Sequence, residues 1–324
     1  MRVIRQLPHL DTTTIARFAA DLAALAHPGQ RVGVAVSGGP DSLALLLLAH
    51  AARPGAIAAA TVDHRLRDGS AAEAAMVAEV CASLGVPHHI LDLHWPKPPT
   101  ANLQAQAREQ RYVLLARWAA THRLPRVATA HHADDQAETL LMRLARGAGL
   151  SGLVATRVRR ELAEGIDLIR PLLGWRKEEL AGIVGAAGLT AVDDPANRDP
   201  RHDRTRMREM LREAEWADPV RLAATANWLA EADAALDWAL ERLRAERVER
   251  DGNALSIDPR DIPPELLRRL LLSAFAELGA HAPRGPELAR ATAALAGGKA
   301  ATLSGLKLEP GPRWRLSPAP PRRG

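Results

Sequence analysis

A short segment with two adjacent glycines has the composition of an anion-binding loop: Ser37, Gly38, Gly39, Pro40, Asp41 and Ser42. Glycine permits positive φ angles and lets the backbone approach an anion closely. A helix that begins directly after such a loop points unpaired N–H groups and the positive end of its dipole at that anion. The serines add hydroxyl donors, and the aspartate could hold Mg²⁺ facing a phosphate. These residues therefore predict a phosphate-binding loop.

This loop differs from two common nucleotide-binding loops. It has no Gly-Lys-Ser/Thr sequence to reach the β- and γ-phosphates, as a Walker loop does, and it lacks the three-glycine dinucleotide fingerprint. The structural alternative is an ordinary glycine turn before a capped helix. The position of the segment, between a β-branched apolar run and a helix, favours the phosphate loop.

A second cluster of chemically active side chains begins at His131. His131 and Asp135 are four residues apart, and so are Asp134 and Glu138, so a helix here would place each pair on a common side near its N-terminus. Such a cluster could bind Mg²⁺ or position a base. A histidine–carboxylate zinc site is an alternative, but the phosphate loop favours magnesium chemistry. Acids that complement a helix dipole would explain the aspartates but not the pair of histidines.

Two further pairs are open to both a functional and a structural interpretation. Asp63 and His64 follow an apolar run and could contact an adenosine, or form a solvated strand end. Arg108 and Arg111 are three residues apart, share a helix face, and could hold phosphates of ATP or of a nucleic acid. A solvated charged face is the alternative for the arginines.

An arginine-rich segment follows Asp193-Asp194-Pro195. Six arginines, among them Arg204 and Arg208, lie between positions 198 and 212. A loop of this composition that runs into a helix suits phosphodiester binding. As a charge run alone, it would be a solvated face.

The elements that must position these residues alternate between strand and helix. Strands are expected at 31–37, 57–63, 87–93, 126–131 and 168–173, and helices at 12–26, from 42, and at 70–84, 102–122, 134–146 and 177–187. This alternation predicts an α/β fold with a parallel sheet flanked by helices. Ligands bind at the carboxyl ends of the strands in such sheets, where the polar clusters fall.

The pattern changes after about residue 211. Helices are expected at 214–249, 263–278 and 287–295, and glycine-broken apolar runs at 302–316 could form a hairpin. We therefore predict an ATP-binding catalytic domain at 1–215 and a smaller, mainly helical domain at 216–324.

Composition restricts the class of protein. The 324 residues are 47% hydrophobic and 25% charged, as in a folded globular protein, and the net charge is +5. With only four lysines, nearly all of the positive charge is arginine, which favours a polyanionic partner, although an arginine-rich genome would explain it equally well. The single cysteine, Cys81, excludes an intrachain disulfide or a cysteine-held iron–sulfur cluster. No signal-peptide core or membrane span is evident, so a cytoplasmic protein without a membrane partner is expected.

Taken together, six segments resemble the tRNA(Ile)-lysidine synthases over about residues 30–212: SGGPDS, VDHRLR, NLQAQAREQRY, HHADDQAET, RPLL and DPANRDPRHDRTRMR. The first segment marks the wider superfamily of PP-loop, or N-type, ATP pyrophosphatases, with its adenine nucleotide α-hydrolase-like fold. The segments HHADDQAET and DPANRDPRHDRTRMR point to the family.

The resemblance implies a specific reaction. ATP adenylates the C2 carbonyl oxygen of the wobble cytidine in an isoleucine tRNA with a CAU anticodon, and the ε-amine of free L-lysine then displaces AMP. It also implies roles for this chain's residues: ATP binding at 37–42, Mg²⁺ at Asp41 and Asp135, a reacting centre at His131 and Asp135, and stabilisation of phosphates or adenylate by Arg108 or Arg111 and by Arg204 or Arg208. The residues after 216 are expected to contact tRNA, and a homodimer is left open.

Three other functions compete with this interpretation. A tRNA thiolase of the same superfamily needs cysteines for sulfur delivery or an iron–sulfur cluster, and this chain has one. A glutamine-dependent amidating enzyme needs a glutaminase domain or partner. A non-catalytic nucleotide sensor or RNA-binding module has no need of the cluster formed by Asp41, His131 and Asp135.

Overall fold

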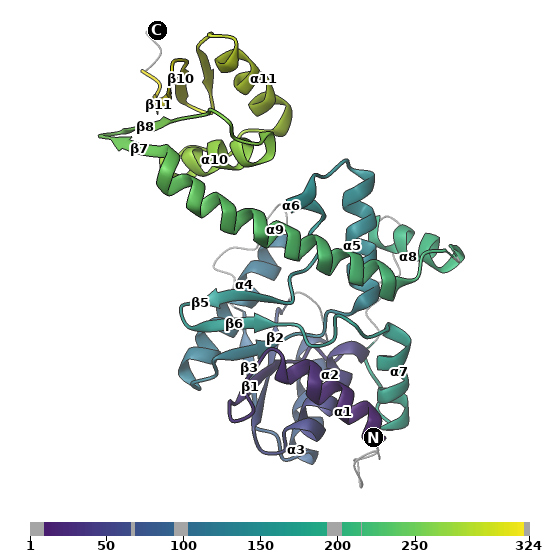
Figure 1. The fold of residues 1–324 in the computed structure, drawn as a ribbon. Coiled ribbons are helices and arrows are strands. Elements are labelled where there is room, and N and C mark those ends of the chain that lie inside the picture. The colour runs from purple at the N-terminus through teal and green to yellow at the C-terminus, as the bar shows by residue number, and fades with distance from the viewer. Residues whose placement is uncertain (1–9, 66–68, 94–102, 193–202, 215, 321–324) are drawn as a thin grey trace. The chain divides into compact units, whose positions relative to one another are not determined.

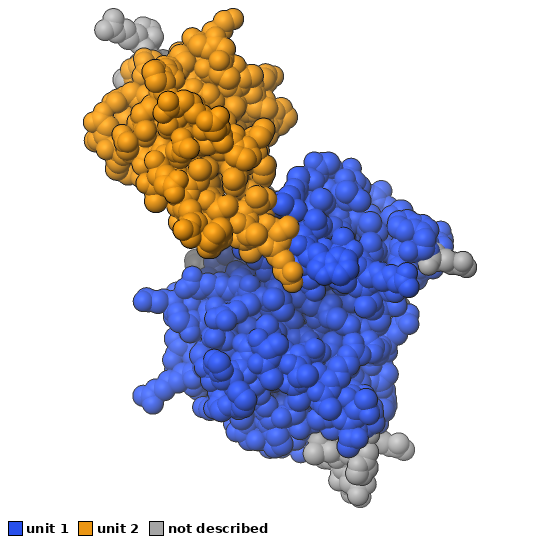
Figure 2. Space-filling model, in the orientation of Figure 1, with its two compact units in different colours: residues 1–230 blue, residues 231–324 orange. Residues whose placement is uncertain are grey.

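The computed structural model describes residues 10–65, 69–93, 103–192, 203–214 and 216–320 (Figure 1). Contacts divide the chain into two compact units, residues 1–230 and 231–324 (Figure 2). The division falls inside one long helix, α9 (Pro219–Arg247). We describe each unit by itself.

The first unit contains a six-stranded sheet of order β3-β2-β1-β4-β6-β5. Its strands are β1 (Val32–Ala35), β2 (Ile57–Asp63), β3 (His88–Asp92), β4 (Arg126–Ala128), β5 (Arg159–Ala163) and β6 (Ile166–Ile169). All neighbouring pairs are parallel except the last, in which β5 runs antiparallel to β6. The predicted parallel sheet is confirmed, and β5 is an additional edge strand.

Helices cover both faces of this sheet (Figure 1). The helices of this unit are α1 (Thr12–Ala23), α2 (Pro40–Ala52), α3 (Ser70–Ser83), α4 (Leu103–Thr121), α5 (Ala133–Ala145), α6 (Leu150–Leu153), α7 (Lys177–Ala186) and α8 (Asp203–Glu213), of which α1, α2, α3, α4 and α7 pack in the cores on the sheet. Strand β2 shows how the layers form, because its side chains alternate between the faces. Ile57 and Ala59 join a core with α1, α2, α3 and α7, whereas Ala58 and Ala60 join a second core with α4.

Helix α2 is buried along most of its length. Its side chains from Leu43 to Ala49 are all buried, so it is apolar on every side, as expected of a helix packed between a sheet and other helices. Pro40 occupies its first turn, where a missing N–H costs no hydrogen bond. The surrounding core therefore fixes the direction of the helix, and with it the position of the loop at its N-terminus.

Gly33 on β1 gives the first testable prediction. A Cβ atom at Gly33 would lie 2.7 Å and 2.9 Å from two ring carbons of Trp118 on α4. We expect Gly33→Ala to lower the free energy of unfolding by about 1–3 kcal/mol, because the buried indole must move. Urea denaturation measures this change. The control is Gly29→Ala, where a Cβ would meet no atom within 4 Å. Equal stability of the two variants would contradict this packing.

The second unit combines helices with a five-stranded antiparallel sheet of order β7-β8-β11-β10-β9. The strands are β7 (Val248–Asp251), β8 (Ala254–Ile257), β9 (Ala301–Leu303), β10 (Leu306–Glu309) and β11 (Trp314–Pro318), and the helices besides α9 are α10 (Pro264–Glu277) and α11 (Gly285–Ala296). Phe275, Leu288 and Trp314 lie in its core. The predicted helices are present, and the predicted hairpin is part of a larger sheet.

Two smaller findings concern the chain as a whole. The only cysteine of the sequence, Cys81 on α3, is buried, and burial raises the pKa of its thiol to about 12. Among the residues that the structure describes, no helix has both the length and the apolar character needed to cross a membrane.

Candidate active site

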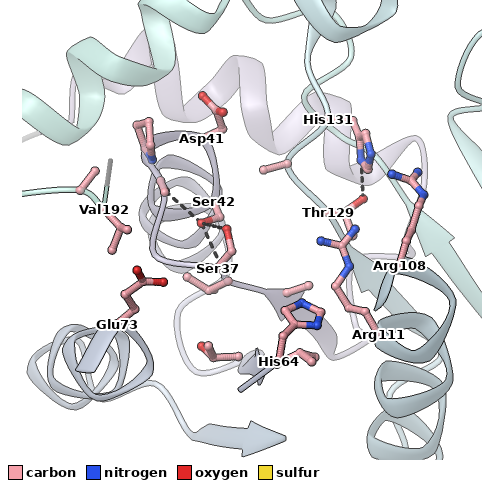
Figure 3. A pocket seen from close by; sticks show the side chains of 18 of the residues that line it. Ser37, Asp41, Ser42, His64, Glu73, Arg108, Arg111, Thr129, His131 and Val192 are labelled. Atoms are coloured by element: carbon pink, nitrogen blue, oxygen red, sulfur yellow. Dashed lines mark hydrogen bonds between the residues drawn. The ribbon is translucent and has the colours of Figure 1, made fainter. Parts of the chain in front are cut away.

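A cavity of about 1140 Å³ opens at the carboxyl ends of β1, β2 and β4 (Figure 3). The structure brings most of the predicted site residues together there. Those that line the cavity are Ser37, Gly39, Pro40, Asp41, Ser42, Asp63, His64, Arg108, Arg111, His131, Asp135 and Arg208. Gly38 lies within the loop itself. Arg204 lies on α8, but its side chain is outside the described residues.

The glycine loop is held in shape by its own serines. The Ser42 hydroxyl donates to the Gly39 carbonyl oxygen at 2.9 Å and accepts from the Ser37 backbone N–H at 3.1 Å. Gly38 has a φ of +85°, which glycine adopts without strain, and its carbonyl oxygen accepts from the Val192 N–H at 2.9 Å. The loop is thus preorganised, and part of the hydrogen-bonding capacity of Ser42 is used inside it.

Helix α2 begins directly after this loop, with Gly39 as its N-cap. The unpaired N–H groups of its first turn therefore lie at the cavity, as an anion-binding site requires. Asp41 also lies in that turn. Within the described residues, its Oδ1 atom is buried and has no hydrogen-bond partner. A buried oxygen without a partner is costly unless a donor or a cation reaches it.

His132 links three carboxylates at the centre of the site. It is only 2% exposed, and its Nε2 atom lies 3.6 Å from carboxylate oxygens of both Asp41 and Asp135. Its Nδ1 atom lies 3.5 Å from Asp134. Burial acts to lower the pKa of His132, but hydrogen bonds to Asp134 and Asp41 outweigh it and raise the pKa to about 10. The imidazolium form therefore compensates a group of negative charges.

The neighbouring His131 has the opposite charge preference. Burial is the main cause that lowers its pKa, to about 2, and the positive charges of Arg170, Arg108 and Arg111 add to the effect. Its Nδ1 atom is hydrogen-bonded to the Thr129 hydroxyl at 3.1 Å. His131 is therefore neutral at physiological pH and can act in the cavity only as a neutral donor or acceptor.

Helix α5 begins at Ala133, with His132 as its N-cap. His131 consequently precedes the helix, and the prediction that four-residue spacing on one helix pairs it with Asp135 is wrong, although both residues line the cavity. The second predicted pair is used to fix neighbouring elements. Asp134 accepts from the Lys177 N–H at 2.8 Å, and Glu138 accepts from the Arg208 Nε at 2.7 Å.

Arg208 thus reaches the cavity with a carboxylate partner already in place. Glu138 is almost completely buried, so the pair joins α5 to α8 and holds the arginine in one position. At the end of β2, Asp63 is buried and accepts from the Arg65 N–H at 2.9 Å. Burial acts to raise the pKa of Asp63, but this bond and one from Ser70 lower it on balance. Asp63 is therefore ionised and part of a built turn.

The whole-chain comparisons agree with this geometry. A family model described as a PP-loop domain matches residues 10–215. A tRNA(Ile)-lysidine synthase of Novosphingobium aromaticivorans is 47% identical over an alignment that covers 95% of this chain and 94% of that protein. One of Zymomonas mobilis is 43% identical and covers 90% of each chain. The chain belongs to the tRNA(Ile)-lysidine synthase family.

A comparison of structures finds a tRNA thiolase of Methanococcus maripaludis that carries a [4Fe-4S] cluster. It superposes with a TM-score of 0.56 at 17% identity, covering 67% of this chain and 79% of that one. This likeness extends to the fold alone. A cysteine-held cluster has no counterpart here, because the sequence contains one cysteine and it is buried.

The PP-loop domain of the lysidine synthase family implies ATP binding, and the donor set fits Mg²⁺ beside that ATP. Asp41 and Asp135 converge on the same nitrogen of His132, and Asp41 has a buried oxygen without a partner. Within the described residues, no three side chains of metal-binding type form a complete metal site. Two carboxylates that share an ion with substrate phosphates are the usual arrangement for Mg²⁺.

Several lining residues were not predicted from the sequence. They are Glu73 on α3, Lys177 at the start of α7, and Glu209 on α8. These residues belong to helices whose approach to the sheet edge depends on tertiary packing, so no local motif marks them. His132 could have been found, because a histidine directly before a helix that opens with two aspartates is placed to receive their charge.

Proposed function

We propose that this chain joins free L-lysine to C2 of the wobble cytidine of an isoleucine tRNA with a CAU anticodon, through an adenylated tRNA intermediate, and releases AMP and pyrophosphate. Membership of the lysidine synthase family makes it an ATP-dependent ligase that forms a carbon–nitrogen bond. The observation that carries the proposal is the shared cavity, which holds the glycine loop together with His131 and Asp135 in a chain so similar to lysidine synthases.

The first half of the reaction needs a site for departing pyrophosphate. The N–H groups of the loop and of the first turn of α2 would bind its oxygens and stabilise the charge that develops there. Asp41 and Asp135 would hold Mg²⁺ against the same phosphates. When bound, Mg²⁺ neutralises phosphate charge. Arg108 and Arg208 line the cavity and would stabilise the α-phosphate or the adenylate, and we assign Arg204 the same role.

The second half of the reaction needs a neutral group that contacts the cytosine base and a carboxylate that attracts the amine of lysine. His131 is neutral and can hydrogen-bond the cytosine without competing for a proton. The carboxylate of Asp135 would attract the ε-ammonium group of lysine towards the reacting carbon. The ammonium group must lose a proton before its nitrogen attacks C2, and AMP leaves with the C2 oxygen as the new carbon–nitrogen bond forms. Asp63 and His64, at the end of β2, would contact the adenosine.

Residues 216–324 form the smaller domain of our proposal and would contact the tRNA. Trp216, Trp228 and Trp238 are at least 64% exposed, and exposed indole rings can stack on unpaired bases. A tRNA substrate also places the enzyme in the cytoplasm.

The test mixes the protein with ATP, labelled L-lysine and a transcript of the isoleucine tRNA with a CAU anticodon. We expect labelled lysine in the tRNA fraction and one AMP released for each lysine incorporated. A transcript with uridine at the wobble position is the matched control and should incorporate none. ATP binding without turnover would support a nucleotide sensor and contradict the proposal. The molar mass of the same preparation distinguishes a monomer from the homodimer that the sequence leaves open.

A further inference from the structure

A group of cationic side chains surrounds one tyrosine next to the cavity, and two of these side chains, Arg108 and Arg111, line the cavity itself. Its members are Arg108, Arg111, Tyr112, Arg160 and Arg170, which we call the Tyr112 cluster. Three guanidinium carbons lie close to the Tyr112 ring centroid, at 4.4 Å for Arg160, 5.3 Å for Arg111 and 5.5 Å for Arg108. Figure 3 shows Arg108 and Arg111 beside His131, across the cavity from Ser37 and Ser42.

Three arginines of this cluster, Arg111, Arg160 and Arg170, differ from other arginines of the chain in their ion-pair partners. Arg176 pairs with Asp134 and Arg208 with Glu138. For Arg111, Arg160 and Arg170, no carboxylate lies within ion-pair distance in the part of the chain that the structure describes. The cluster therefore concentrates positive charge in one place.

Two atoms at the back of the cluster strengthen the case for an anion. Arg170 is only 3% exposed, and one of its Nη atoms donates to the Arg157 carbonyl oxygen. Among the described residues, its Nε has no hydrogen-bond partner, and neither does the buried Nε of Arg111. Buried cationic donors without acceptors are costly, so a site of this kind is stable only if an anion reaches it.

We propose that the Tyr112 cluster is a second anion subsite of the cavity and binds a phosphodiester of the RNA strand next to the target cytidine. This inference rests on the proposed function. The glycine loop already provides the site for the pyrophosphate of ATP, on the opposite wall. A cytidine that presents its base to His131 brings its own phosphodiesters to the same wall as the cluster. Guanidinium groups match phosphate oxygens through paired hydrogen bonds.

Within this subsite the residues have different tasks. Arg111 lines the cavity and would contact the phosphodiester directly, whereas Arg108, which also lines the cavity, keeps its proposed role at the adenylate. Tyr112 would act as a positioning residue, because its ring holds three guanidinium groups by cation–π contact. Arg160 comes from the edge strand β5 and adds positive charge next to the same ring.

The test uses Arg160→Gln in the full chain, because Arg160 is half-exposed and its replacement leaves Arg170 in place. Binding of the isoleucine tRNA transcript is measured without ATP or lysine over a range of salt concentrations. We expect the affinity to fall up to about tenfold. The slope of log K against log salt should fall by up to about 0.7, the value for one neutralised phosphate on a single strand, because the subsite loses one positive charge. Affinity for ATP and the KM for lysine should not change.

The matched control is Arg159→Gln, the neighbouring position on β5, whose guanidinium pairs with Asp167 and is outside the cluster. This variant should bind tRNA with the wild-type slope of log K against log salt. Arg160→Lys keeps the charge without the planar fork and should recover part of the affinity. A thermal melt of each variant separates loss of binding from loss of folding.

A second measurement places the contact on the RNA. An anticodon stem-loop with a neutral methylphosphonate beside the cytidine should bind the wild-type protein more weakly than the unmodified stem-loop does. The Arg160→Gln variant should bind the two stem-loops equally well, because the effects of two changes that remove the same contact are not additive. An unchanged salt slope in Arg160→Gln would overturn the inference. A rise confined to the KM for lysine would also overturn it, because the cluster would then bind the carboxylate of lysine. A loss confined to ATP binding would overturn it as well.

These outcomes are independent of catalysis. If no lysine is incorporated yet Arg160→Gln weakens tRNA binding as described, the proposed reaction fails and the RNA subsite stands. If lysine is incorporated normally and the variant binds tRNA like the wild type, the subsite fails and the proposed reaction stands.

Discussion

Replacing Asp41 with asparagine should lower the rate of AMP formation at least about a thousandfold while the chain still folds. The side chain lies in the first turn of α2, beside the phosphate loop, and one of its oxygens is buried without a partner. An amide keeps the size of the side chain but removes the charge that would hold Mg²⁺ against the departing pyrophosphate. The measurement is AMP release in the presence of ATP, lysine and the tRNA transcript.

Glu178→Gln provides the control for this prediction. Glu178 also lies in the first turn of a helix of the first unit, but it is exposed and does not line the cavity. Its replacement should leave AMP formation unchanged. Turnover by Asp41→Asn within tenfold of the wild-type rate would remove Asp41 from the mechanism.

The second large effect concerns the stability of the chain and its dependence on pH. His132→Gln removes the imidazolium that compensates Asp41, Asp134 and Asp135, and should lower the free energy of unfolding by about 3–5 kcal/mol at pH 6. The pKa of His132 is raised to about 10 in the folded chain, from 6.5. The proton therefore stabilises the fold fully below about pH 6.5, and this stabilisation is lost as the pH rises through 10.

The difference between wild type and His132→Gln should consequently shrink between pH 6 and pH 10. Urea denaturation of both proteins, in the presence of a metal chelator and without nucleotide, measures this difference in the free energy of unfolding. Exposed His27, replaced by glutamine, is the control and should change the free energy of unfolding only slightly. A cost of His132→Gln that stays constant up to pH 10 would show that the residue is not held as an imidazolium.

The first unit could be predicted largely from local sequence signals. Strand β2 is a continuous run of small, buried side chains, and α2 is a continuous apolar helix after a glycine loop, so both produce a clear pattern. Strand β5 was missed because its sequence, Arg-Arg-Glu-Leu-Ala, is mostly charged and lies at the edge of the sheet, where no apolar alternation is needed. Its pairing with β6 is a tertiary property.

The second unit was harder to predict for the same reason. Strand β7 is exposed along most of its length and follows α9 without a break, so it looks like the end of that helix. Strand β8 is only four residues long. Short strands of this kind are stabilised by cross-strand partners that are distant in sequence, here on β11.

The candidate site divides in a similar way. The loop from Ser37 to Ser42 is a local motif, and its chemistry follows from residue type and order. The opposite charge states of His131 and His132 could not be predicted, because two adjacent histidines look alike in sequence. Three carboxylates face the ring of His132, whereas three arginines lie around the ring of His131, and this asymmetry exists only in the folded chain.

The burial of Cys81 has a practical consequence for measuring motion in this protein. A thiol with so high a pKa, enclosed in the core of the first unit, should not react with maleimide dyes while the chain is folded. The natural sequence can therefore serve as a silent background for fluorescent labelling. One engineered cysteine on each unit would let energy transfer between two dyes follow the chain as ATP and tRNA bind, without removal of the native cysteine.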